Sequence, residues 1–270
     1  LKIKLSKIIL EGPDEELKKT EITQPAILTT SYAIFNVLKK EFNLNLQSVK
    51  FFAGHSLGEY SALLAANSIK FEDALKLVHS RGKFMQNAVP LGKGLMLAVM
   101  GIKKEELNSL IKEIKNGVCE IANDNSHGQI ILSGSKESIT EINDLLKKDK
   151  KRSILLPVSA PFHCSLMLPA AEKMKVLLNK VNFAKPDISL VSNVTAEKIS
   201  DNDIISNLLY KQIFSQVRWR ESVEFMTKNG VNEFIEIGPG KVLSGLIKRT
   251  NDKVMTKSIN SLEDIKNYNA

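Results

Sequence analysis

The sequence predicts an α/β protein that carries a second, smaller domain inserted into it. Short β-branched and aromatic runs alternate with helical periodicity along most of the 270 residues, which is typical of a parallel sheet covered by helices. Residues 54–58 (Gly-His-Ser-Leu-Gly) lie between a predicted strand and a predicted helix. In the middle of the chain the order of elements changes to β-α-β-β-α-β, which is the ferredoxin-like unit.

The beginning of the chain predicts two helical segments. The first residue is Leu1 rather than methionine, so we expect the natural start, and any targeting segment there, to lie upstream. Residues 1–10 interleave lysines with apolar residues and indicate the end of a helix or a loop. Gln24-Pro25 predicts the start of a longer helix, with proline at its first position, where a missing N–H is tolerated.

The next elements are a buried strand over residues 49–53, the turn at 54–58, a helix through Ala66 and a second helix over 72–86. The turn matches G-x-S-x-G, the nucleophile elbow, in which a serine occupies a sharp strand-to-helix corner. We expect positions 54 and 58 to need a residue as small as glycine, because the strand and the helix approach each other closely there. A glycine-tolerant turn without chemistry is the alternative interpretation.

The inserted unit is predicted from its periodicity. We expect strands over 95–100, 118–122, 129–133 and 153–158, with helices over 104–115 and 136–148. Five basic residues lie within 147–152, in its last connection, and indicate a solvated turn or a contact with an acidic partner. The remaining chain returns to the α/β pattern, with a helix over 167–180, a strand over 188–192, two helices up to about residue 229, a strand over 233–237, a helix and a final strand near Val254.

Composition excludes several classes of protein. Hydrophobic residues make up 43% and charged residues 25%, and no run approaches the roughly 20 apolar residues of a membrane helix. The net charge of +8 is spread along the chain, which does not favour a nucleic-acid binder. Cys119 and Cys164 lie far apart, so we expect neither a disulfide scaffold nor a zinc site, and we expect a reducing compartment. Residues 238–241 (Gly-Pro-Gly-Lys) lack the spacing of a phosphate loop.

A serine nucleophile needs a base, and four histidines are available. We expect His55 to be a supporting or packing residue, His79 to be a core or surface residue in the middle of a helix, and His127 to be exposed in a Ser-His-Gly turn. His163 follows a proline-containing loop that leaves the inserted unit, where two domains meet, and is the candidate base. Arg81 is either an exposed helical arginine or a bidentate clamp for a carboxylate.

Residues 54–62 (GHSLGEYSA) resemble the signature of the malonyl-CoA:acyl carrier protein transacylases. The resemblance implies an α/β-hydrolase-like large subdomain over residues 1–93 and 159–270, with a ferredoxin-like subdomain over 94–158. Further segments resemble that family in the same order: Gly12-Pro13 to Ala26, Arg81–Gln86, Pro157–Cys164, Gln212–Trp219 and Glu236–Leu243.

The resemblance also implies roles for individual residues. Ser56 corresponds to the nucleophile and His163 to its general base, while the N–H of Leu57 corresponds to one oxyanion donor. Arg81 corresponds to the partner of the malonyl carboxylate, and the backbone carbonyl of Gln212 to the group that orients the imidazole. The other substrate-binding positions that it implies are Gln24, Asn123 and Asn125.

The implied activity is a ping-pong transfer of malonyl from malonyl-CoA to the phosphopantetheine thiol of acyl carrier protein, for fatty acid biosynthesis. No metal or other cofactor is expected, and the partners are malonyl-CoA and an acidic carrier protein that a chain of charge +8 attracts. We expect a cytoplasmic monomer, although an upstream segment could direct the protein to an organelle.

One departure from the family concerns the start of the chain. The family begins with a strand and a Gly-Gln-Gly turn whose glutamine N–H is the second oxyanion donor, and no residue before Leu1 supplies it. We therefore expect the chain as written to be poorly active or unstable alone, because a lost oxyanion donor costs about 10²–10³ in rate and a lost strand exposes unpaired sheet edges.

Two other functions compete with transfer. A serine esterase or thioesterase of the α/β-hydrolase type would share Ser56 but would require an acid between it and His163, and no acid stands out there. A chain that only docks a carrier protein would not form an ester on Ser56.

Overall fold

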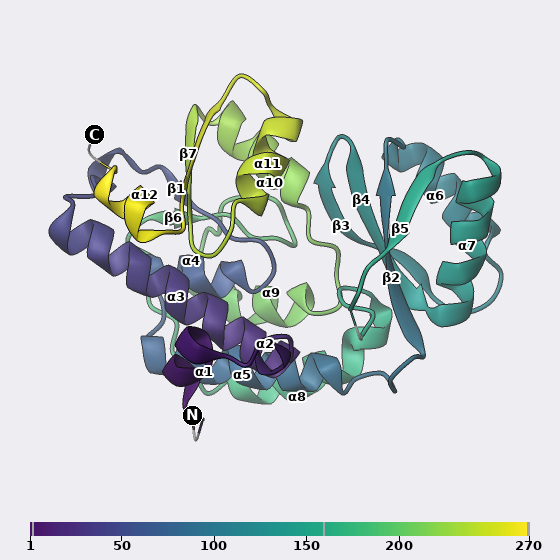
Figure 1. Cartoon of the computed structure of the whole chain (residues 1–270), viewed down its shortest axis with the longest axis horizontal. Helices are drawn as coiled ribbons and strands as arrows, with labels where there is room; N and C mark the ends of the chain where they lie inside the picture. The colour runs from purple at the N-terminus through teal and green to yellow at the C-terminus, as the bar shows by residue number, and fades with distance from the viewer. Residues whose placement is uncertain (2, 159, 269–270) are drawn as a thin grey trace.

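The computed structural model describes residues 1, 3–158 and 160–268 and has a mixed α/β architecture. A larger part, formed by both ends of the chain, lies beside a smaller part formed by the middle of the chain (Figure 1). Ser159, in the loop expected to lead to the base, lies outside the described residues. No helix in the described ranges is both long and apolar enough to cross a membrane.

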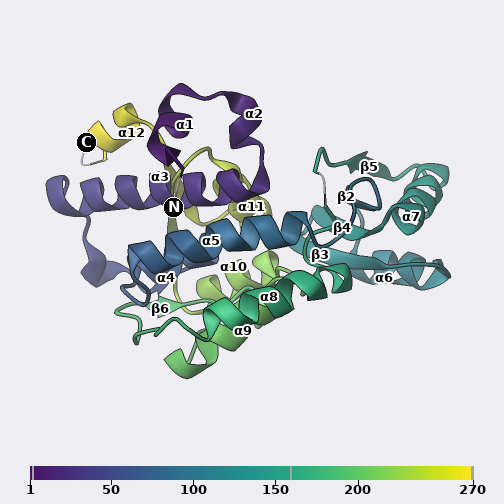
Figure 2. The ribbon, with the colours of Figure 1, turned by 90° about the horizontal axis from the view of Figure 1, so that it is seen from below.

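The larger part consists of helices around two separate pairs of parallel strands (Figures 1 and 2). Strand β1 (Phe51–Phe52) pairs with β6 (Ser189–Leu190), and β7 (Glu233–Ile237) pairs with β8 (Met255–Ile259). The helices are α1 (Leu5–Glu11), α2 (Asp14–Leu17), α3 (Thr20–Glu41), α4 (Gly58–Ala65), α5 (Phe71–Gln86), α8 (Leu168–Leu178), α9 (Ile205–Gln212), α10 (Trp219–Lys228), α11 (Val242–Thr250) and α12 (Leu262–Lys266), with 3₁₀ turns at Leu46–Ser48, Ser165–Met167 and Asn202–Ile204.

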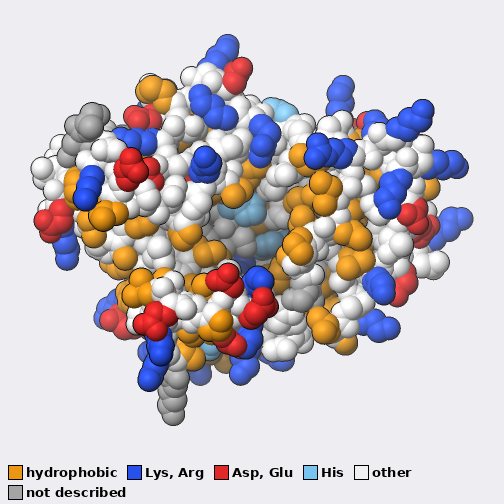
Figure 3. Space-filling view, in the orientation of Figure 1, with side chains coloured by type: hydrophobic (Ala, Val, Ile, Leu, Met, Phe, Trp, Pro, Cys, Tyr) orange, Lys and Arg blue, Asp and Glu red, His pale blue; other side chains and the backbone are white. Residues whose placement is uncertain are grey.

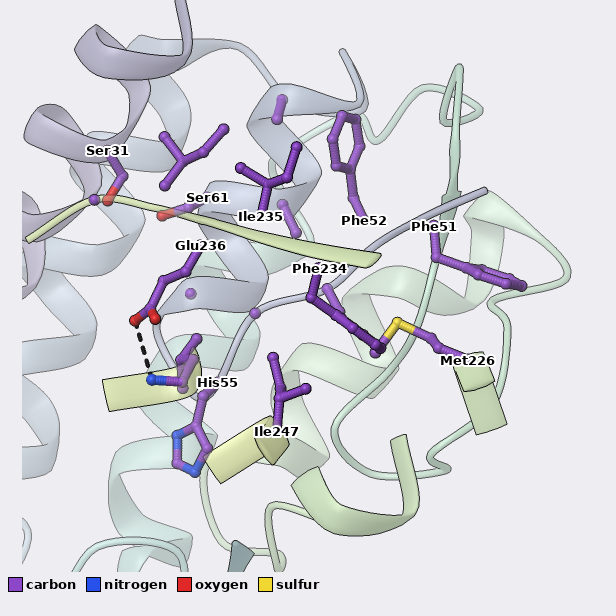
Figure 4. Close-up of a pocket in the computed structure, with 18 of the residues that line it drawn as sticks. Ser31, Phe51, Phe52, His55, Ser61, Met226, Phe234, Ile235, Glu236 and Ile247 are labelled. Carbon is purple, nitrogen blue, oxygen red and sulfur yellow. Dashed lines mark hydrogen bonds between the residues drawn. The ribbon is translucent and has the colours of Figure 1, made fainter. Parts of the chain in front are cut away.

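A cavity of about 680 Å³ separates β1 from β7. Phe51, Phe52, Phe234 and Ile235 of the two strands line it, and His55 lies at one end (Figure 4). The strand predicted over residues 49–53 is reduced to β1, because its ladder partner among the described residues is β6 alone.

The smaller part is a four-stranded antiparallel sheet with two helices on one face (Figure 1). The strand order is β3-β4-β2-β5, so the first strand in sequence lies between the third and the fourth. The elements are β2 (Gly94–Met100), α6 (Lys104–Glu113), β3 (Cys119–Ser126), β4 (Gln129–Ser135), α7 (Lys136–Lys148) and β5 (Arg152–Leu155). Leu97 and Leu132 of the sheet pack against Leu107 and Ile139 of the helices, which covers one face with aliphatic side chains.

Helix α3 begins at Thr20, so the expectation that Pro25 is its first residue was wrong. A proline inside a helix leaves the carbonyl four residues earlier without its helical N–H partner. That carbonyl belongs to Glu21, and Nδ1 of His79 on α5 lies 2.9 Å from its oxygen. The histidine of a neighbouring helix therefore pairs with the carbonyl that Pro25 leaves without a partner, and α3 continues as a helix on both sides of the proline.

The two parts are joined by backbone and by charge. Asn123 forms a parallel bridge with Val217, and the N–H of Asp124 donates to the Val217 carbonyl at 3.0 Å. The buried Asp124 carboxylate accepts from Nε and Nη2 of Arg220, at 3.0 and 2.9 Å, and from Lys104 at 3.2 Å. These contacts fix β3 against α10. The surface is hollowed between the parts, and histidine side chains are visible in the hollow (Figure 3).

Candidate active site

The strand-to-helix corner after β1 carries Ser56 in an unusual backbone conformation. Its φ is 54°, in the left-handed region that non-glycine residues rarely adopt. A Cβ on Gly54 would lie 2.0 Å from the carbonyl oxygen of Gly58, so the corner closes only with glycine at 54. A Cβ on Gly58 would meet no described atom within 4 Å, which corrects the expectation that both glycines are needed for space.

The Ser56 hydroxyl lies next to the imidazole of His163, the candidate base. Its Oγ is 2.7 Å from Nε2 of His163, and Nδ1 of His163 is 2.8 Å from the backbone carbonyl of Gln212. A carbonyl only accepts, so Nδ1 carries the proton and Nε2 is free to accept one from the Ser56 hydroxyl. His163 is 5% exposed, and its burial together with the charge of Arg81 lowers its pKa to about 3. The imidazole is therefore neutral at physiological pH.

Arg81 is 1% exposed, which excludes the interpretation as an exposed helical arginine. Its Nη1 donates to Oε1 of Gln24 at 2.8 Å. Its Nη2 donates to Ser56 Oγ at 3.0 Å and to Oε1 of Gln212 at 2.9 Å. Among the described residues its Nε has no hydrogen-bond partner. No described carboxylate forms an ion pair with the guanidinium, so a buried positive charge lies beside the nucleophile and remains available to an anion.

Two buried residues complete this network and were not identified from the sequence. Oε2 of Glu59 accepts from Nε2 of Gln212 at 2.6 Å and from the backbone N–H of Asn193 at 3.3 Å. Burial raises the pKa of Glu59 to about 7 although these bonds and the charge of Arg81 act in the opposite direction. Glu59 is the only charged residue of α4, and a charged residue in so apolar a helix was the signal that could have identified it. Asn193 offered only its place after a short strand.

Of the remaining predicted site residues, Asn123 and Asn125 belong to β3 of the smaller part, and Leu57 belongs to the larger part. Oδ1 of Asn125 is 2.9 Å from Nε2 of His55, whose ring packs edge-on against Trp219. Asn123 is buried at the bridge between the two parts. Leu57 is the N-cap residue of α4, so its N–H belongs to the first turn of a helix. His79 bonds Glu21, and His127 lies at the surface beside Glu224.

No group of three or more metal-ligating side chains is found in the part of the chain that the structure describes. The groups that the described residues bring together at the site are Ser56, His163 and the hydrogen-bond donors around them. A hydroxyl paired with a neutral imidazole at a helix N-terminus can accept an acyl group. A buried guanidinium beside that hydroxyl can bind the anionic end of such an acyl group.

Comparison with known proteins identifies the family. The acyl transferase domain profile matches residues 1–268. The malonyl CoA-acyl carrier protein transacylase of Bacillus subtilis is 42% identical over 268 residues, which are 98% of this chain and 83% of that protein. The Escherichia coli K12 protein of the same name is 43% identical over 252 residues, covering 93% and 81%.

Solved structures agree with this result. The Clostridium perfringens malonyl CoA-acyl carrier protein transacylase superposes with a TM-score of 0.94 at 41% identity, covering 98% of this chain and 83% of that one. A malonyl-transacylase in complex with a type II PKS acyl-carrier protein superposes with a TM-score of 0.93 at 39% identity, covering 97% and 84%. A profile match over nearly the whole chain, with relatives above 40% identity, places this chain in the acyl transferase family.

Proposed function

We propose that the chain is an [acyl-carrier-protein] S-malonyltransferase, which moves a malonyl group from malonyl-CoA to acyl carrier protein through an ester on Ser56. The observation that carries this proposal is the distance of 3.0 Å between Nη2 of the buried Arg81 and Ser56 Oγ. An acyl group on that oxygen places its free carboxylate next to the guanidinium when only one methylene separates carbonyl and carboxylate, as in malonyl.

In the first half-reaction His163 Nε2 takes the hydroxyl proton as Ser56 Oγ attacks the thioester carbonyl. The Leu57 N–H, at the N-terminus of α4, is placed to stabilise the oxyanion. CoA leaves as a thiol with the proton from His163, and malonyl remains as an ester. When the malonyl carboxylate neutralises Arg81, one cause of the low His163 pKa is removed, so the base strengthens with the correct substrate in place.

In the second half-reaction the carrier's thiol attacks the ester, and His163 takes the thiol proton and returns it to Ser56. Water has to be kept from competing for the ester, and the buried side chains of Arg81, His163 and Gln212 around Ser56 limit its access. The carrier as partner is supported by the related malonyl-transacylase whose structure contains an acyl-carrier protein. The charge of +8 favours encounter with an acidic protein.

We also propose the division into an α/β-hydrolase-like part over residues 1–93 and 159–270, of which Lys2, Ser159, Asn269 and Ala270 lie outside the described residues, and a ferredoxin-like part over 94–158. The order β3-β4-β2-β5, antiparallel throughout, supports the second assignment. Among the described residues β1 pairs with β6 alone and β7 with β8 alone, and the cavity between β1 and β7 supports a further strand in that place.

Labelled malonyl-CoA tests the function. The protein should retain label on Ser56, transfer it to holo acyl carrier protein, and lose all labelling in Ser56→Ala. A hydrolase would instead release free malonate whether or not the carrier is present, which would exclude the proposal. The hydrolase alternative is disfavoured because Nδ1 of His163 faces a backbone carbonyl rather than a carboxylate.

A further inference from the structure

The corner that carries Ser56 is held by a side chain from a distant segment. Asn193 follows β6 and is 1% exposed. Its Oδ1 accepts the N–H of Ser56 at 2.7 Å, and its Nδ2 donates to the carbonyl of Gly54 at 2.8 Å. The backbone can only donate at the first point and only accept at the second, so the amide has one possible orientation. One side chain therefore pairs two backbone groups on either side of His55.

These two bonds act where the backbone is strained. Ser56 has a φ of 54°, a conformation that persists only where the surroundings hold it. A buried N–H or C=O left without a hydrogen-bond partner would destabilise the corner further. The Gln212 side chain holds the carbonyl of Ser56 at 2.9 Å, and Asn193 holds its N–H. Without the Asn193 amide the N–H side of the corner would be free to relax, and Oγ would move from its place 2.7 Å from His163.

Asn193 is itself tied to the group that orients the base. Its backbone N–H donates to Oε2 of Glu59 at 3.3 Å, and the same oxygen accepts from Nε2 of Gln212 at 2.6 Å. The backbone carbonyl of Gln212 in turn accepts from His163. The nucleophile and the base are thus held by one connected set of buried hydrogen bonds, although they lie 107 positions apart in the sequence.

We infer that Asn193 is a positioning residue for the nucleophile, which holds Ser56 in its left-handed conformation and so keeps Oγ in line with His163 and with the Leu57 N–H. The inference deepens the malonyl transfer proposed above and rests on it. Asn193-Val194-Thr195 also has the pattern of a glycosylation acceptor, but the buried amide is occupied in holding this corner.

The test compares Asn193→Ala with a matched control, Asn143→Ala. Asn143 of α7 is 6% exposed and accepts a hydrogen bond from Ser153 at 2.7 Å, in the smaller part of the molecule. Two rates are measured: transfer of label from saturating malonyl-CoA to Ser56, and inactivation by phenylmethylsulfonyl fluoride. The sulfonyl fluoride forms a sulfonate ester on Oγ with loss of fluoride and requires no carboxylate.

Asn193→Ala should slow both reactions about 10²-fold, the loss expected for a displacement of roughly 1 Å. The KM for malonyl-CoA should stay within about threefold, because Arg81 is not altered. Asn143→Ala should lower Tm about as much as Asn193→Ala does, but it should leave both rates unchanged. A folded Asn193→Ala that reacts at the wild-type rates would overturn the inference. If the wild type takes no label from malonyl-CoA, the proposed function fails, and the sulfonyl fluoride rates still decide the role of Asn193.

Asn193→Asp provides a second variant in case alanine prevents folding. It keeps an acceptor for the Ser56 N–H but offers an oxygen to the Gly54 carbonyl, so it should also slow both reactions. Wild-type rates in the folded aspartate variant would equally overturn the inference. Amide exchange in the wild type needs no variant: the Ser56 N–H should be protected, and exchange as fast as in an unfolded chain would show that the bond to Asn193 does not form.

Discussion

The elbow makes unequal demands on its two glycines, and this leads to the sharpest prediction. In Gly54→Ala the new methyl carbon would lie 2.0 Å from the Gly58 oxygen and 2.7 Å from the Glu59 nitrogen, all of it against backbone. Relief requires the end of β1 and the start of α4 to separate by roughly 1 Å or more, which costs about 1–3 kcal/mol of folding free energy. A displacement of that size at Ser56 should lower kcat about 10²-fold.

The assay is malonyl transfer to holo acyl carrier protein, with unfolding in urea measured on the same preparations. Gly58→Ala is the matched control, because a methyl group there meets no described atom within 4 Å and its backbone is not left-handed. It should keep its stability and at least a third of the wild-type kcat. The reasoning would be refuted if both variants were active or if both were impaired to the same extent, since each adds one methyl group to the same motif.

Further predictions concern the charge, the junction and the helix of Pro25. Arg81→Ala should reduce kcat/KM for malonyl-CoA by about 10–10²-fold and raise the relative use of acetyl-CoA, since a hydrogen bond to a charged group contributes about 1.5–3 kcal/mol. The same variant should shift the acid side of the pH–rate profile for acetyl-CoA, where His163 loses its proton, to higher pH, because Arg81 lowers the pKa of His163. Burial raises the pKa of Glu59 to about 7, so the folded protein keeps a proton that the unfolded chain loses above about 4.5; urea titrations should therefore show wild type losing stability relative to Glu59→Gln as pH rises from 4.5 to 7. Asp124→Asn should lower the free energy of unfolding by about 1–3 kcal/mol, because Arg220 and Lys104 lose their buried partner but keep Glu224 and Glu221; an unchanged free energy of unfolding would contradict this. His79→Ala should cost about 1 kcal/mol beside Pro25 and measurably less in a Pro25→Ala background, where the helix supplies its own partner for the Glu21 carbonyl.

Local patterns predicted the elements of the smaller part well. Helix α7 begins and ends at the predicted residues, and β2 and β4 differ from prediction by one or two residues, because alternation and periodicity are regular there. The start of α3 could not be predicted in this way. Proline normally opens a helix, and the exception depends on a histidine 54 positions further along the chain, which only the packed structure brings near.

The same limit applies to the site. The turn at Ser56 was recognisable because its chemistry depends on adjacent residues. The burial of Arg81 was not, since its neighbours Ser80 and Lys83 are polar and its partners Gln24 and Gln212 come from other helices. Asn193 and Glu59 were missed for the same reason: each acts only through contacts with residues far away in the sequence, and the one local signal, the single charge of α4, does not by itself indicate a site.

The junction between the two parts has a consequence for protein engineering. On β3, Asp124 pairs with Arg220 of α10. The next residue, Asn125, has its Oδ1 2.9 Å from Nε2 of His55, the residue that precedes the nucleophile. A chimera that takes its small sheet from a relative therefore replaces both the residue that pairs with Arg220 and the residue that contacts His55. Such a graft should succeed only when the donor's α10 segment, with Arg220 and Val217, travels with it.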